Sequence, residues 1–199
     1  LVMSFTGQLP VNASWSLSLW HALLVFSVAG WCLLISGPRL GYISVFILIF
    51  SPALLDLRTN YVLEMPLISL TTFSLWQLGA WLDLKEGGKY KTLFLAFFAS
   101  SLALLVKQSA LIALSPGLIL ATIIAFNRSK IKPIQILIGF LIILIMIFPW
   151  LSHNWILTIG GTKRAVLESA ANEGDPSIFS FVSWIWYLKL IPGQIGFNA

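Results

Sequence analysis

Charged side chains are scarce in this sequence. Asp, Glu, Lys and Arg make up 10% of its 199 residues, whereas hydrophobic residues make up 58% and the mean hydropathy is +0.93. A soluble domain of this size would need many more charges to cover its surface. Long apolar runs separated by short charged stretches instead predict an all-α polytopic transmembrane helix bundle.

Motifs of soluble enzymes are also missing. The stretch KEGGKYKT at 85–92 has Tyr90 where a phosphate-binding loop needs Ser or Thr, and no GxGxxG follows a predicted strand. The two histidines, His21 and His153, belong to no HExxH motif, so we expect no zinc site built from this chain alone. One cysteine, Cys32, excludes an internal disulfide.

The net charge of +5 does not indicate a nucleic-acid partner. A nucleic-acid surface needs Lys and Arg gathered on one solvated face. Here the basic residues sit at the ends of apolar runs, where they report on membrane topology.

Six candidate spans follow from the apolar runs. They cover about 17–36, 38–55, 65–83, 92–106, 109–126 and 134–152. One helix over 92–126 would be about 52 Å long, far beyond the roughly 30 Å hydrocarbon layer, with Lys107 near its middle. Two helices that turn at Lys107 and Gln108 also place the basic connections on one side, which the positive-inside rule assigns to the cytoplasm.

The predicted bundle fills residues 1–152. Residues 153–199 are expected to form a non-cytoplasmic loop of the same domain, in which an aromatic cluster makes 177–191 suitable for an interfacial helix. We therefore expect an integral, multi-pass protein of the plasma or inner membrane. The chain opens at Leu1 and looks like a fragment of a longer membrane protein.

The six-span arrangement gathers the remaining charges at the non-cytoplasmic side. In DLRTNYVLEMPL at 56–67, Arg58 and Tyr61 can donate hydrogen bonds to a phosphate. Asp56 can simply pair with Arg58, an interaction of little energetic value. Glu64 precedes a helix start, where it can stabilise the helix N-terminus; alternatively, it holds a substrate hydroxyl or a cation.

Lys107 and His153 are expected at the same side. At mid-membrane Lys107 would cost about 2.5–3.5 kcal/mol on insertion scales, so it must lie at the interface or in a polar site. It either extends to the headgroups or grips a lipid-linked phosphate. His153, just outside the last span, is either a hydrogen-bonding interface residue or a general base.

Four segments together carry a family resemblance. The order of RTNYVLEMPLISLTTFSLWQLGAWL, SLALLVKQSALIALSPGLIL, FPWLSHNW and KRAVLESAANEGDP resembles the membrane-embedded GT-C glycosyltransferases of the dolichyl-phosphate-mannose protein mannosyltransferase type, and bacterial members related to the aminoarabinose transferases. The similarity covers roughly residues 15–195. It implies transfer of a hexosyl or pentosyl group from a polyprenyl-phosphate-linked sugar donor to a lipid, glycan or protein acceptor at the non-cytoplasmic face.

The same resemblance implies that one catalytic group is missing. Family members carry a catalytic aspartate in a first external loop that nothing in this sequence matches, so the chain looks like the middle of the family's fold. Glu64 is then the best candidate for a catalytic carboxylate in this sequence, in support of the missing aspartate, and Asp56 is the second candidate.

The chemistry of such a donor agrees with the residues. Its lipid tail needs an apolar bundle and its anionic head needs cations at the membrane rim, a requirement that Arg58 and Lys107 meet. Tyr61 and His153 are the further candidate substrate contacts. No cofactor is firmly implied, and a divalent cation at the carboxylates stays open. Membrane lipids, but no nucleic acid, are expected partners.

Two other interpretations remain open. A transporter or lipid flippase is the alternative, because broken helices mark transporters and 115–117, SPG, offers a break. A scaffold subunit of a membrane complex is the third.

Overall fold

The computed structural model describes residues 10–59, 62–83, 88–127, 133–164, 180–182, 185, 188 and 189. Every regular element assigned within these residues is an α-helix, which confirms the all-α prediction for this part of the chain. In chain order the helices are α2 (Pro10–Ser36), α3 (Pro38–Phe50), α4 (Pro52–Thr59), α5 (Glu64–Trp81), α6 (Tyr90–Val106), α7 (Ala110–Phe126) and α8 (Pro133–Arg164).

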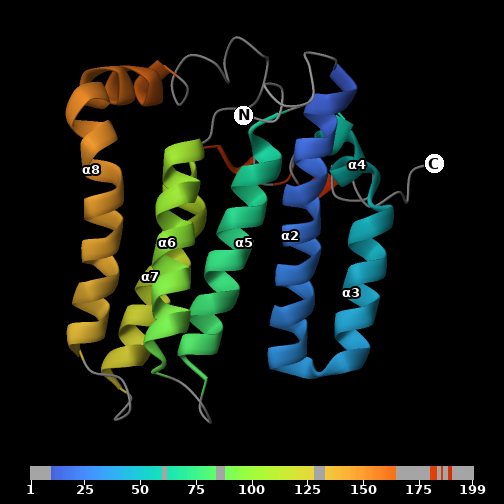
Figure 1. Ribbon diagram of the computed structural model, residues 1–199, viewed down its shortest axis with the longest axis horizontal. Helices are drawn as coiled ribbons and strands as arrows, with labels where there is room; N and C mark the ends of the chain where they lie inside the picture. The colour runs from blue at the N-terminus through green and yellow to red at the C-terminus, as the bar shows by residue number, and fades with distance from the viewer. Residues whose placement is uncertain are drawn as a thin grey trace.

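The long helices run side by side and alternate in direction along the chain, so that the packed neighbours α6 and α8 are parallel, as are α2 and α5. Figure 1 shows α8, α6, α5, α2 and α3 in a row, and the same neighbours make the extensive contacts of the fold. Helix α7 lies behind α6 in that view and packs against α5 and α6. We call the end where α5 begins and α6 ends the Lys107 end, uppermost in Figure 1, and the opposite end, where α3 begins, the Arg39 end.

A one-residue turn connects α2 to α3. Gly37 has φ 88°, a left-handed conformation that glycine adopts without steric penalty, and its N–H bonds the Cys32 carbonyl. Pro38 then begins α3, because a proline at the first helical position loses no intrahelical hydrogen bond. The two helices therefore form a tight antiparallel hairpin at the Arg39 end.

The predicted span over 38–55 is broken. Helices α3 and α4 meet at Ser51 and differ in direction by 52°. Pro52 has no N–H with which to bond the Leu48 carbonyl four residues earlier, so the ladder stops there. Residues 56–59, predicted as loop, consequently lie in α4 and carry Asp56 and Arg58 on a helix.

The chain reverses at Lys107, as predicted. Helix α6 ends at Val106, Lys107 is extended with φ −157° and ψ 132°, and α7 begins at Ala110. The Lys107 carbonyl accepts the N–H of Ala110, which closes the turn. Two helices, rather than one rod, therefore occupy 92–126.

Small residues let the helices approach closely. A Cβ added at Gly139 of α8 would lie 2.5 Å from the Phe97 ring of α6, and one at Gly30 of α2 would overlap the Trp76 ring of α5. Such close packing of backbone against a large side chain is typical of helix interfaces in membranes, where the apolar solvent gives little driving force of its own.

The centre of the bundle contains hydroxyl groups. Ser74 of α5 and Ser100 of α6 are fully buried, and their hydroxyl oxygens lie 2.7 Å apart. Ser100 also bonds the Ala96 carbonyl at 2.9 Å, so its one proton points there and Ser74 donates to Ser100. Helix α5 is thus polar inside the bundle, with its hydroxyl groups paired.

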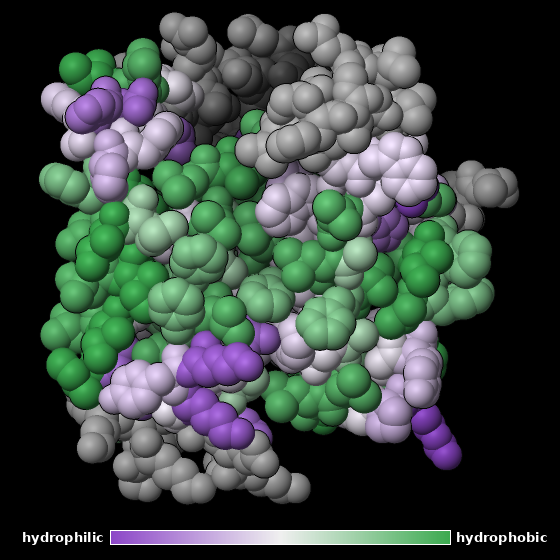
Figure 2. Space-filling model, in the orientation of Figure 1, coloured by the Kyte–Doolittle hydropathy of each residue, from purple (hydrophilic) through white to green (hydrophobic). Residues whose placement is uncertain are grey.

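Within the part of the chain that the structure describes, two helices are long and apolar enough to cross a membrane by length and composition. These are Trp15–Ser36 and Ile134–Gly161, and the bent pair α3 and α4 gives a third if it counts as one span. Helices α6 and α7 have 17 residues each, or about 26 Å. Figure 2 shows hydrophobic side chains covering the middle of one face, with hydrophilic residues gathered towards its ends.

The last predicted span is longer than expected. It was predicted to end at residue 152, with a loop from 153 onwards, but α8 continues to Arg164 and contains Pro149. Figure 1 shows α8 turning at its upper end, so that its last part lies across the Lys107 end of the bundle. We call this part, residues 153–164, the α8 arm. The interfacial helix expected over 177–191 falls mostly outside the described residues.

Candidate functional site

Lys107 and Glu64 form an ion pair at the Lys107 end of the bundle. The Lys107 Nζ lies 2.5 Å from the Glu64 Oε1 and donates a hydrogen bond to it. The two residues are 43 positions apart in the chain. The reversal between α6 and α7 places Lys107 beside Glu64 at the start of α5. The predicted meeting of residue 107 with the 56–64 segment is therefore confirmed.

Local backbone geometry presents both side chains at this end. Glu64 is the first residue of α5, where backbone N–H groups have no intrahelical acceptor and favour a negative charge. Lys107 directly follows the last residue of α6, and its N–H still bonds the Ala103 carbonyl. The start of α5 has no side-chain capping hydrogen bond, so Glu64 can stabilise this helix end through the charge of its carboxylate while it contacts Lys107.

Solvent exposure limits the energy of this pair. The Lys107 side chain is 45% exposed and the Glu64 side chain 39% exposed. Exposed pairs contribute about 0–1 kcal/mol, because water and salt screen them. Folding stability is therefore a weak reason for placing two charges here.

The pair changes the acid–base properties of the carboxylate. The hydrogen bond from Lys107 lowers the pKa of Glu64 below its ordinary value, against a smaller opposing effect of burial. A carboxylate with a lowered pKa is a weaker proton acceptor. Glu64 in this state is suited to hold Lys107 in place rather than to remove a proton.

Helix α4 brings two further predicted residues to the same end. Arg58 is half-buried and Asp56 is exposed. Two positions apart on a helix, they lie on different faces of α4. Arg58 follows Leu57, which with Leu54 packs against a buried cluster on α2 and α5. Arg58 is thus the more buried of the two side chains.

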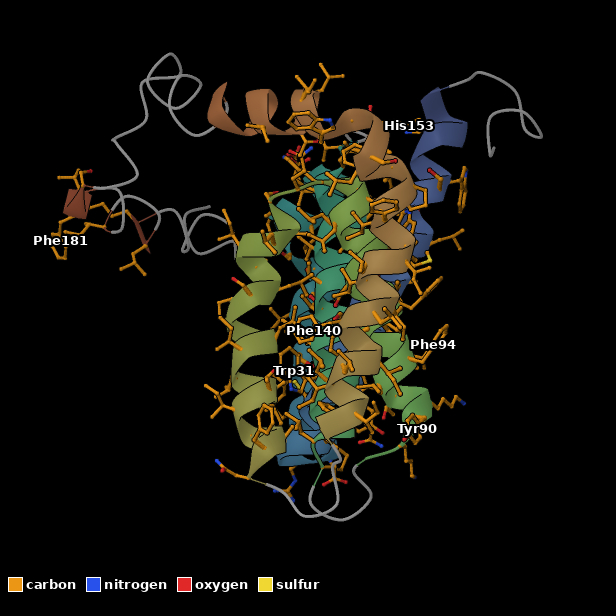
Figure 3. The ribbon with its side chains drawn as sticks, turned by 90° about the vertical axis from the view of Figure 1, so that its left-hand side faces the viewer. Trp31, Tyr90, Phe94, Phe140, His153 and Phe181 are labelled. Carbon is orange, nitrogen blue, oxygen red and sulfur yellow. The ribbon has the colours of Figure 1, made fainter. Side chains whose placement is uncertain are left out.

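The α8 arm passes over the α6–α7 turn. Thr158 of the arm and Gln108 of the turn are joined by a side-chain hydrogen bond of 3.5 Å. Figure 3 places His153 at the upper end of α8, where the helix turns. His153 is exposed, and its Nδ1 lies 3.1 Å from the Ser152 hydroxyl. The arm therefore brings His153 to the Lys107 end of the bundle.

Not every predicted site residue can be placed. Tyr61 lies outside the described residues. Among the described residues no group of three or more His, Cys, Asp and Glu side chains comes together as a metal site would require. A divalent cation held by Glu64 stays one of the alternatives that the sequence left open.

The sequence did not predict the contact between Gln108 and Thr158. Thr158 lies in a stretch expected to be a loop, because Gly160 and Gly161 follow it. A long apolar periodicity through 149–159 was the available signal, since it continues the pattern of the preceding span.

Comparisons with known proteins give no relative. No family model, no curated protein and no solved structure matches the chain.

Proposed function

We propose that the protein is an integral-membrane glycosyltransferase that moves a sugar from a polyprenyl-phosphate donor to an acceptor at the non-cytoplasmic face. In this proposal the apolar runs form about six spans, with the Lys107 end outside and the Arg39 end in the cytoplasm. The short α6 and α7 are then accommodated by packing against neighbours or by local thinning of the bilayer.

One observation carries the proposal. A lysine and a glutamate from distant parts of the chain meet at one end of an apolar bundle, in an exposed pair that adds little stability. A lipid-linked phosphate needs a cation at the boundary between apolar bundle and water. A glycosyl transfer also needs a carboxylate near that cation.

The lowered pKa of Glu64 suggests an order of events. The donor phosphate competes with Glu64 for Lys107, because both are anions attracted to the same ammonium group. Once Lys107 bonds the phosphate, Glu64 loses the interaction that lowers its pKa and becomes a better base.

The transfer step then balances without a further reactant. The acceptor hydroxyl oxygen forms a bond to the anomeric carbon, and the bond from that carbon to the phosphate oxygen breaks with inversion. The electron pair goes to the phosphate, which Lys107 stabilises, and the hydroxyl proton goes to Glu64. The products are the glycosylated acceptor and polyprenyl phosphate.

A transporter or lipid flippase is the second candidate. The 52° bend between α3 and α4 favours it, because broken helices line the substrate sites of many transporters. The other break considered from the sequence is not present, since α7 continues through Pro116.

Donor turnover separates the two functions. The reconstituted protein is incubated with radiolabelled polyprenyl phosphomannose, phosphoglucose and phosphoarabinose, together with a lipid acceptor fraction. A glycosyltransferase releases polyprenyl phosphate, whereas a carrier moves the lipid with its sugar bond intact. We expect K107A to lose release and K91A, which removes an exposed lysine at the Arg39 end, to retain it. An intact donor in every reaction would refute the enzyme.

A further inference from the structure

A histidine interrupts an apolar stripe of α2. Leu17 and Leu24 are buried in one cluster with Met65 of α5, and His21 lies between them on the same face of the helix. His21 is 7% exposed. A polar ring buried among leucines lowers folding stability unless its nitrogen atoms find partners.

One ring nitrogen of His21 has a structural role. The imidazole donates a hydrogen bond to the backbone carbonyl of Leu48 on α3. This carbonyl cannot bond residue 52, because Pro52 has no N–H, and it accepts the N–H of Ser51 at 3.4 Å instead. His21 thus adds a second, side-chain donor at the break between α3 and α4.

The other ring nitrogen has no partner within the described structure. Nε2 is fully buried and makes no hydrogen bond, so the bond to Leu48 comes from Nδ1. A neutral imidazole that donates from Nδ1 carries an acceptor lone pair on Nε2. His21 therefore offers an unused acceptor deep in the upper part of the bundle.

A cation lies near this acceptor. Helix α4 packs over the stripe through Leu54 and Leu57, and Arg58 continues the same face, four residues after Leu54. The charge of Arg58 acts on the His21 ring. No residue of helix α4 is fully buried.

The position relative to the ion pair follows from a hydrogen bond. Ser69 of α5 donates to the carbonyl of Trp20, the neighbour of His21, at 2.7 Å. Ser69 is five residues after Glu64, which places His21 about 7–8 Å deeper along the bundle than the ion pair.

We propose that His21 and Arg58 form a subsite that binds the glycosyl phosphate of the donor and recognises its sugar. The ligand that fits an acceptor beside a cation carries a hydroxyl donor next to an anionic group. In a glycosyl phosphate, a sugar hydroxyl donates to Nε2 and a phosphate oxygen accepts from Arg58. This subsite rests on the proposed function and makes the sugar, not only the phosphate, part of recognition.

Two substitutions at His21 separate the subsite from the structural role. In H21N the amide nitrogen takes the place of Nδ1 and keeps the donor to Leu48, while the acceptor at Nε2 is lost. In H21L both are lost. Affinities are measured in vesicles for sugar-free polyprenyl phosphate and for whichever polyprenyl phosphomannose, phosphoglucose or phosphoarabinose the wild type binds most tightly.

We expect H21N to bind the glycosylated lipid about 3- to 10-fold more weakly than wild type and to bind the sugar-free lipid equally. Wild-type affinity of H21N for the glycosylated lipid, or an equal loss for both lipids, would overturn the subsite. R58Q is a second variant, and it should lower the affinity for both lipids. It lies on a helix with no buried residue. Unchanged affinity for both in R58Q would equally overturn it.

Turnover measured in parallel keeps the two proposals apart. Turnover by wild type with unchanged affinities in H21N removes only the His21 subsite. Binding without turnover, and with the expected loss in H21N, removes the enzyme and leaves a sugar-lipid carrier. No preference of wild type for any glycosylated lipid over the sugar-free lipid overturns the subsite outright.

Discussion

The ion pair between Glu64 and Lys107 should matter little for stability and much for donor binding. Two unit charges 4 Å apart attract by ~1 kcal/mol in water and ~4 kcal/mol at an effective dielectric constant of 20. The side chains are 39% and 45% exposed, so the pair belongs near the lower limit. After screening and the loss of side-chain freedom, we expect a coupling free energy of about 0.5 kcal/mol.

A double-mutant cycle measures this coupling. The free energy of unfolding is determined by SDS titration in mixed micelles for wild type, E64Q, K107Q and the double variant. We expect each single variant within about 1 kcal/mol of wild type. Donor affinity should respond differently, because a charge-assisted hydrogen bond to phosphate contributes about 1.5–3 kcal/mol, or roughly 10- to 150-fold in Kd.

The exchange variant E64K/K107E supplies the matched control. It keeps an ion pair between the same positions but moves the cation to the start of α5, where the helix dipole disfavours it by about 0.3–1 kcal/mol. Stability should stay near that of wild type while donor affinity stays as low as in K107Q. A coupling of 3 kcal/mol or more, with donor affinity unchanged in K107Q, would show a structural pair of the buried kind.

Three further predictions concern stability. G139A should lower the free energy of unfolding in SDS titration by about 1–3 kcal/mol, because the new methyl would meet the confined Phe97 ring. G160A in the same helix has open space and should raise that free energy by up to about 1 kcal/mol. Equal effects of the two substitutions would refute the packing. S100A should lower the free energy of unfolding by about 1 kcal/mol, and by more than S74A does, because it leaves the buried Ser74 hydroxyl without its acceptor. The reverse order would contradict the assigned proton direction. The pKa of Glu64 is lowered, so the stability advantage of wild type over E64Q should be present above its ordinary value of 4.5 and vanish as pH falls through the lower folded pKa; an advantage that grows on acidification would contradict the sign.

The sequence predicts the helix pattern well because length alone decides the main question. A rod over 92–126 would overrun the bilayer, so the reversal at Lys107 follows from the rise per residue and the charge bias. The structure has that reversal, and the pairing with Glu64 follows from it. Local propensities could not give the pairing, because it joins residues 43 positions apart.

The misses lie where the backbone departs from a simple span. A proline inside an apolar run does not reveal whether the helix stops, as at Pro52, or continues, as at Pro116 and Pro149. Tertiary contacts decide this, because a neighbouring group must replace the lost hydrogen bond. At Pro52 the Leu48 carbonyl accepts the Ser51 N–H and also a hydrogen bond from His21, which in the sequence is only a lone histidine in an apolar run.

The central claim is that the Lys107 end faces outwards and receives a polyprenyl-phosphate donor. Its most direct measurement is labelling of Q108C by a membrane-impermeant maleimide in oriented vesicles, in a C32S background, with R39C as the control at the opposite end. We expect Q108C to react from outside and to be protected by the glycosylated lipid, while R39C reacts only after permeabilisation. Reaction of Q108C only after permeabilisation, or at the same rate with and without the lipid, would contradict the claim.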